Sequence, residues 1–186
     1  IGEATAEVLA QTGSSVVVTD IDAAAAEQTA QIIQQRGQRA LSMEQDVRSR
    51  EQWDDVFAAA KEHFGPVTGL VNNAGVSGAG RDRLEEEGGL EAWQSIMSIN
   101  LDAVHLGCRK AIQEMKLTGG SIVNISSVMG LVGGAGPAYN ASKGGVRLLS
   151  KSIAVHCGKM GYSIRCNSVH PGYIWTPMVR NIVENM

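Results

Sequence analysis

A tyrosine and a lysine spaced four residues apart, Tyr139 and Lys143, could together transfer a proton. If the segment is helical, these positions share one face, so the phenol and the ammonium can converge on one point. A free phenol has a pKa of about 10, which is too high for an effective base at neutral pH. Because a cation held nearby favours the phenolate, the spacing predicts a tyrosine suited to moving a proton on and off an alcohol.

Ser127 could act on the same substrate atom. It precedes Tyr139 by twelve residues, and the glycine-rich segment between them is long enough to fold back over a strand end. Its hydroxyl can donate to a carbonyl oxygen, whereas a role as a hydrolytic nucleophile is implausible because the surrounding sequence is not GxSxG. A tyrosine and a serine that share a substrate oxygen suit the interconversion of an alcohol and a ketone. The hydride of that reaction requires a cofactor.

The elements that must position these residues alternate along the chain. Apolar, β-branched runs predict buried strands, and between them apolar residues recur at helical spacing. This alternation indicates β-α-β crossovers and a mostly parallel sheet covered on both faces. We therefore expect one doubly wound, Rossmann-like α/β domain over residues 1–186. The predicted strands are residues 14–20, 40–47, 67–75, 121–127 and 164–172, and the clearest helices are 49–65, 90–115 and 139–160.

Polar residues and glycines gather at the ends of the predicted strands. In sheets of this kind, ligands bind beyond the carboxyl ends of the strands, so these residues should share one edge. The sequence thus predicts a ligand site there. The residues are Asp20, Asp46, Asn72, Asn73, Ala74, Gly75, Ser126, Ser127, Pro171 and Gly172.

Asp20 lies eighteen residues after Gly2, across one predicted helix and one predicted strand. A dinucleotide-binding fold places there the carboxylate that accepts hydrogen bonds from the adenosine ribose, and Gly2 would be the last glycine of the phosphate-binding loop. The alternative is that Asp20 only caps the following turn or helix. Residues 18–28 contain no basic side chain that could offset a 2′-phosphate, and Asp22 adds a negative charge. We therefore expect NAD rather than NADP as the cofactor.

Asn100 falls on the same predicted helical face as apolar residues such as Trp93 and Val104. Its side chain should therefore point toward the sheet. An unpaired buried amide costs roughly 1–3 kcal/mol, so a partner is required. That partner could be backbone, water or another site residue, and both a structural and a functional asparagine fit this pattern.

Composition excludes several other classes of protein. The 186 residues are 44% hydrophobic and 19% charged, with a net charge of −3, so nothing suggests binding to nucleic acid or to an anionic membrane. We find no signal peptide and no apolar run of membrane-spanning length, so we expect a cytoplasmic protein. The three cysteines, Cys108, Cys157 and Cys166, should be small core residues. His63, His105 and His156 have no ligand spacing, and we expect no metal.

An ordered set of motifs then resembles a known family. It comprises "NNAG" at 72–75, Asn100, "NISS" at 124–127, "YNASK" at 139–143 and "HPGYIWTPM" at 170–178. The set is similar to that of the short-chain dehydrogenases/reductases of the bacterial secondary-alcohol and hydroxysteroid type, across essentially the whole chain. "YxxxK" alone is weak evidence, but the ordered set is highly specific.

The resemblance implies a role for each matching residue. Tyr139 would be the general acid/base, Ser127 would orient the substrate oxygen with Ser126 as the fallback, and Lys143 would contact the nicotinamide ribose. Asn100 would hold a water of the proton relay. The remaining implied cofactor contacts are Asp46 and Val47 at the adenine, Asn73, Ala74 and Gly75 on the adenosine side, Thr176 at the carboxamide, and Pro171 and Gly172 at the last strand end.

Two departures from the family pattern limit what the resemblance implies. The first strand and most of the "TGxxxGIG" loop have no counterpart before Ile1 and Gly2, and the last strand has none after Met186. We therefore expect a fragment. The expected function is NAD-dependent interconversion of a secondary alcohol and a ketone, on a steroid or a cyclic alcohol. Alternatives are an NADPH-dependent reductase of carrier-bound 3-oxoacyl esters and a non-catalytic nucleotide-binding regulator. The resemblance also implies a homo-oligomer, a tetramer or a dimer.

Overall fold

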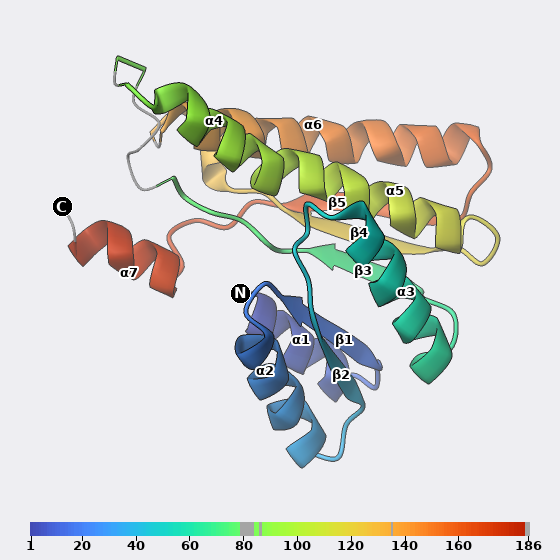
Figure 1. Ribbon diagram of the computed structural model, residues 1–186. Helices are drawn as coiled ribbons and strands as arrows, with labels where there is room; N and C mark the ends of the chain where they lie inside the picture. Colours follow the sequence, from blue (N-terminus) through green and yellow to red (C-terminus); the bar gives the residue numbers. More distant parts are fainter. Residues whose placement is uncertain (79–83, 86, 135, 185–186) are drawn as a thin grey trace. The chain divides into compact units, whose positions relative to one another are not determined.

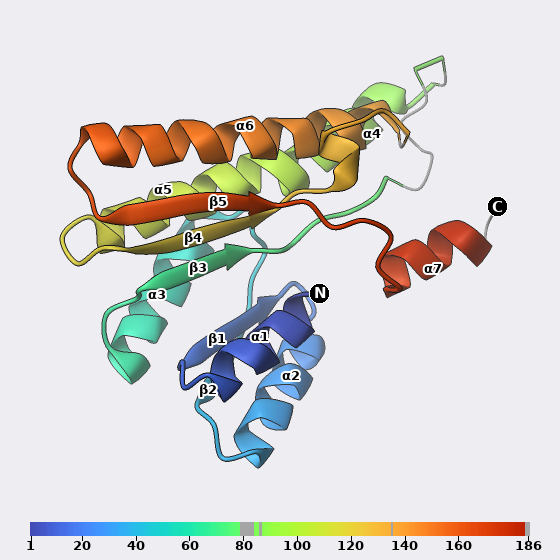
Figure 2. The same cartoon turned by 180° about the vertical axis from the view of Figure 1, so that it is seen from behind.

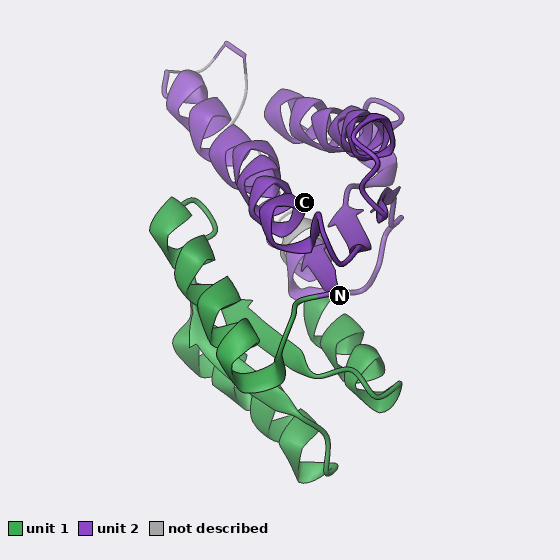
Figure 3. Ribbon diagram, turned by 90° about the vertical axis from the view of Figure 1, so that its right-hand side faces the viewer, with its two compact units in different colours: residues 1–67 green, residues 68–186 purple. Residues whose placement is uncertain are grey.

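The computed structural model describes residues 1–78, 84–85, 87–134 and 136–184. Helices and parallel strands alternate along the chain, which confirms the predicted Rossmann-like α/β fold class (Figure 1). The chain divides into two compact units, residues 1–67 and residues 68–186 (Figure 3). That residues 1–186 form one domain stays a prediction.

The first unit is built on two parallel strands. Strand β1 (Val16–Asp20) pairs with β2 (Ala40–Glu44), and Asp20 lies opposite Glu44 at the carboxyl end. Helix α2 (Ala23–Gln35) packs on both strands, and α1 (Gly2–Gln11) packs on β1 and α2. Helix α3 (Arg50–Phe64) follows β2 and ends at Gly65, whose φ of +86° is a conformation that favours glycine.

The second unit contains a three-stranded parallel sheet in the order β3-β4-β5. Two long helical segments, α5 and α6, lie side by side along the sheet (Figures 1 and 2). Its elements are β3 (Gly69–Asn72), α4 (Gly89–Met97), the π-helical η1 (Ser98–Asp102), α5 (Ala103–Met115), β4 (Gly120–Ile125), the 3₁₀ turn η2 (Val128–Gly130), α6 (Pro137–Lys159), β5 (Ile164–Val169) and α7 (Pro177–Glu184).

A buried amide network fixes the register of β3 against β4. Asn72 and Asn124 are direct partners in the ladder, and the Asn72 Nδ2 donates to Asn124 Oδ1 at 2.8 Å. The Asn124 Nδ2 donates in turn to the Ser150 hydroxyl of α6 at 2.9 Å. Any slip in register would leave these buried amides unpaired, at roughly 1–3 kcal/mol each.

The three cysteines are buried, as predicted, and two of them also contact a buried polar side chain. Cys108 Sγ lies 3.4 Å from Asn124 Oδ1, and Cys166 Sγ lies 3.6 Å from Asn124 Nδ2. Burial raises the pKa of the Cys157 thiol. Among the residues that the structure describes, no group of three or more metal-ligating side chains occurs.

The long helix predicted over residues 90–115 is wrong in one respect. The structure has α4 and α5 joined by the π-helical segment η1, which inserts extra backbone into the turn that carries Asn100. The observed strands are also shorter than the predicted ones, because the terminal residues of each predicted range form the loops at the strand ends. Within the described part of the chain, no helix is long and apolar enough to span a bilayer.

Candidate active site

The candidate site lies where β4 ends and α6 begins, within the second unit. Pro137 occupies the first turn of α6, where its fixed φ suits a helix start, and it places Tyr139 and Lys143 in the first two turns. The segment after Ser127 passes close to this helix. A Cβ on Gly130 would lie 2.6 Å from the Lys143 carbonyl oxygen, so only glycine allows this approach.

Lys143 is buried, with 4% of its surface exposed. Its Nζ donates to the Ile125 carbonyl oxygen at 2.9 Å and lies 5.9 Å from the centroid of the Tyr139 ring. Burial lowers the pKa of this ammonium to about 8, because desolvation disfavours the charged form. The structure therefore brings the predicted pair together, with the lysine close to titration at mildly alkaline pH.

The two serines at the end of β4 have different environments. The Ser126 hydroxyl donates to the Lys143 carbonyl oxygen at 2.7 Å and so ties the strand to α6. Ser127 Oγ instead accepts the Met129 N–H at 3.1 Å as the cap of η2. Because Ser127 Oγ is an acceptor in this contact, its own hydrogen can be donated to another oxygen. This difference favours Ser127 over Ser126 as the hydroxyl that meets a substrate.

Asn100 is fully buried and its amide is paired with backbone. Its Oδ1 accepts the Val76 N–H at 2.8 Å, and its Nδ2 donates to the Val76 carbonyl oxygen at 2.9 Å and to Ser142 Oγ at 3.2 Å. The Ser142 hydroxyl donates to the Tyr139 carbonyl oxygen at 2.8 Å. Asn100 thus connects the loop after β3 to the helix turn that carries the tyrosine.

Sequence reasoning missed two residues that hold the Ser127 segment. His170 Nδ1 lies 3.1 Å from the Ser127 carbonyl oxygen, and its Nε2 lies 2.9 Å from Ser168 Oγ. The Asn140 Nδ2 donates to the Met129 and Val132 carbonyl oxygens at 2.6 and 2.7 Å. The only signals in the sequence are that His170 begins the "HPG" segment and that Asn140 directly follows Tyr139.

Several predicted cofactor residues belong to the same unit as this site. Gly75 comes close to it, because an added Cβ would lie 3.2 Å from both Asn100 Oδ1 and Lys143 Nζ. Such a crowded backbone position fits a flat ligand laid against the lysine. Asn73, Ala74 and Gly172 are exposed, Pro171 accepts the Val128 N–H through its carbonyl, and Thr176 Oγ1 accepts the Val179 N–H in α7.

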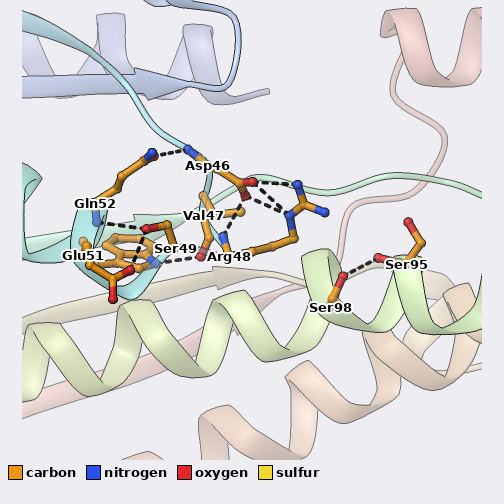
Figure 4. A network of polar contacts seen from close by, with 9 residues as sticks. Asp46, Val47, Arg48, Ser49, Glu51, Gln52, Ser95 and Ser98 are labelled. Carbon is orange, nitrogen blue, oxygen red and sulfur yellow. Dashed lines mark hydrogen bonds and ion pairs between the residues drawn. The ribbon is translucent and has the colours of Figure 1, made fainter.

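The other predicted cofactor residues lie in the first unit. Asp20 is exposed at the end of β1, and Asp22, not Asp20, caps α2 by accepting the N–H groups of Ala24 and Ala25. Asp20 Oδ1 accepts the Asp22 N–H at 3.0 Å, so most of its carboxylate remains available. Gly2 begins α1. Asp46 and Val47 follow β2 in a loop with several polar contacts (Figure 4).

A tyrosine and a buried lysine at the start of α6, beside a serine at the carboxyl end of a parallel strand, form the arrangement of a nicotinamide-dependent dehydrogenase. Residues 1–186 match the family described as short chain dehydrogenase. The chain belongs to the short-chain dehydrogenase family.

Its relatives include characterised bacterial enzymes. It is 41% identical to the NADP-dependent (R)-specific alcohol dehydrogenase of Lentilactobacillus kefiri, over 98% of this chain and 72% of that enzyme. It is 38% identical to the 3-beta-hydroxysteroid dehydrogenase of Comamonas testosteroni, over 97% of this chain and 69% of that enzyme. It is 37% identical to the cyclopentanol dehydrogenase of the same species, over 95% of this chain and 69% of that enzyme. The predicted family and the predicted oxidoreductase activity on alcohols are confirmed.

Proposed function

We propose that the enzyme interconverts a secondary alcohol and its ketone with NAD, using Tyr139 as general acid/base. The observation that carries this proposal is the arrangement of Tyr139, Lys143 and Ser127, which packing and hydrogen bonds hold in one unit. When bound, the nicotinamide supplies the hydride acceptor or donor. Because the cofactor carries the hydride, we assign the transfer of the proton to side chains of the protein.

The proton transfer is assigned to named atoms. In alcohol oxidation the Tyr139 phenolate oxygen takes the hydroxyl proton, and in ketone reduction the phenol returns it. The Ser127 hydroxyl donates to the same substrate oxygen and stabilises the negative charge that develops there. Lys143 contributes positive charge and is assigned to the nicotinamide ribose. Asn100 is assigned to a water of the proton relay. Its Oδ1 has one remaining lone pair, which can accept a hydrogen bond from that water.

We propose NAD as the cofactor although one relative is named as NADP-dependent. The support is Asp20: its carboxylate does not cap α2 and is exposed at the strand end. A 2′-phosphate at this position would bring about two negative charges against it. Val18 to Gln28 include no arginine or lysine to offset them.

Steady-state kinetics with NAD and NADP test this assignment. We expect kcat/KM to favour NAD by at least about a hundredfold, or about 2.7 kcal/mol. Exchanging Asp20 for Ser and Ile21 for Arg should narrow or reverse the preference. Equal efficiency with NADP in the unmutated enzyme would contradict the role of Asp20.

We propose a cyclic secondary alcohol or a hydroxysteroid as the substrate, because relatives at 37–38% identity are named for such compounds. Turnover assays with cyclopentanol, a 3-hydroxysteroid and a carrier-bound 3-oxoacyl ester separate this class from the ketoreductase alternative. Absence of turnover with every alcohol would favour the non-catalytic regulator. We also propose that the protein is cytoplasmic and homo-oligomeric. The homo-oligomer is supported by the exposed apolar side chains of Leu148 and Val155 on α6 and of Met160 directly after it.

A further inference from the structure

An acceptor and a donor of hydrogen bonds lie next to each other in the loop after β2. The Asp46 carboxylate is an acceptor, and the next backbone donor, the Val47 N–H, has no partner among the residues that the structure describes. The edge of an adenine ring carries the complementary groups, since its 6-amino group donates and its N1 accepts. A 6-oxo purine presents an acceptor and an N–H in those places, so it would oppose both protein groups.

Helix α3 holds the backbone on either side of the Val47 N–H. The Asp46 N–H donates to Gln52 Oε1 at 2.6 Å, and the Trp53 Nε1 donates to the Val47 carbonyl oxygen at 2.8 Å. Figure 4 shows Asp46 between Gln52 and Arg48. Ser49 caps α3 by accepting the Gln52 N–H, so the helix start that supplies these contacts is itself fixed.

Arg48 holds the carboxylate. Its Nε lies 2.9 and 3.1 Å from the two Asp46 oxygens, its Nη2 lies 2.6 Å from Oδ2, and its backbone N–H donates to Oδ1 at 2.9 Å. Three N–H groups make these four contacts, because the single Nε hydrogen is shared between the two oxygens. Two carboxylate oxygens offer about four lone-pair directions, so the carboxylate can accept one more donor.

The ion pair does little for stability by itself. The side chains of Arg48 and Asp46 are 47% and 29% exposed, and exposed pairs of this kind contribute little to folding. Its clearest effect is on the carboxylate, because the hydrogen bonds from Arg48 hold both Asp46 oxygens and also lower the pKa of Asp46. A fixed, ionised carboxylate with one open acceptor position is what a single amino group requires.

We propose that Arg48 is a positioning residue for the adenine of the dinucleotide and makes the enzyme selective for a 6-amino over a 6-oxo purine. It orients the Asp46 carboxylate so that one of its oxygens accepts from the amino group while the Val47 N–H meets N1. The inference rests on the proposed assignment of Asp46 and Val47 to the adenine.

The test compares the affinity of the enzyme for NAD and for its deaminated analogue, nicotinamide hypoxanthine dinucleotide, by calorimetry without substrate. Arg48→Met should weaken NAD binding on the order of tenfold and leave binding of the analogue unchanged, so the preference for NAD narrows. Arg50→Met is the matched control. It removes the same charge from an exposed residue two positions further on and should leave the preference unchanged.

A third variant, Asp46→Asn, tests the underlying site. Its amide can donate to a 6-oxo group, so it should narrow the preference for NAD on its own. If Asp46→Asn narrows the preference and Arg48→Met does not, the adenine site stands and the role of Arg48 is overturned. An equal loss of both ligands in Arg48→Met would show a general charge effect and also overturn it. If Asp46→Asn changes nothing, the assignment of Asp46 fails, and the inference with it.

Discussion

Burial of Lys143 should make the stability of the enzyme depend on pH in a specific direction. Its pKa is lowered from 10.5 to about 8 in the folded protein. Between these values the unfolded chain binds the proton more tightly than the folded chain does, so unfolding becomes less favourable as pH rises. The free-energy cost of burying the charged lysine is therefore present in full below pH 8, and it disappears as pH approaches 10.5.

The magnitude follows from the two pKa values. At about 1.36 kcal/mol for each pH unit, the cost at pH 7 is about 3 kcal/mol, and most of it, about 2–3 kcal/mol, is lost by pH 10. Lys143→Met lacks this titration. The free energy of unfolding of the variant minus that of the wild type should therefore decrease by about 2–3 kcal/mol between pH 7 and pH 10.

Urea unfolding of both proteins at pH 7, 8, 9 and 10, without dinucleotide, measures this difference. Other groups that titrate in the range are present in both proteins and cancel. Lys151→Met is the matched control, because Lys151 is exposed on the same helix, and its difference from the wild type should not change with pH. A constant difference between Lys143→Met and the wild type would refute the argument that burial depresses the pKa of Lys143.

Three further substitutions test the arrangement around the site. Gly130→Ala places a Cβ against the Lys143 carbonyl oxygen and should lower the free energy of unfolding by about 1–3 kcal/mol, as measured in urea, and unchanged stability would contradict the close approach. Asn100→Ala leaves both polar groups of Val76 without their partner and should cost about 1–3 kcal/mol by the same assay, whereas a loss of activity alone would mean that Asn100 is not structural. His170→Phe removes the contact to the Ser127 carbonyl oxygen and should lower kcat by about tenfold with unchanged dinucleotide affinity, as measured by steady-state kinetics and calorimetry.

The part of the site in the second unit could be predicted because the ends of β3, β4 and β5 share one edge of a parallel sheet. The apolar runs indicate where these strands end, and the polar residues at those ends follow from the sequence. The pair Tyr139 and Lys143 followed from helical spacing alone. What spacing could not give was the burial of Lys143, which depends on packing between α6 and the end of β4 and reverses the simple picture of a permanently charged lysine.

Other features depend on contacts between distant segments. The stripe over residues 90–115 reads as a regular helix, since one extra residue per turn at Asn100 leaves the apolar pattern nearly unchanged. The side chain of His170 reaches a carbonyl oxygen on another strand end, forty-three residues earlier. Asp22 could be identified as the helix cap only from coordinates, because Asp20 and Asp22 are equally good capping residues by type.

The assignment of Tyr139 is tested most directly by Tyr139→Phe, with turnover and dinucleotide affinity measured on the same preparation. Only the transferable proton is removed, so kcat for alcohol oxidation should fall by about 10²–10⁴-fold. The dissociation constant for NAD, measured by calorimetry, should stay close to the wild-type value. Wild-type turnover in this variant would contradict the central role of Tyr139.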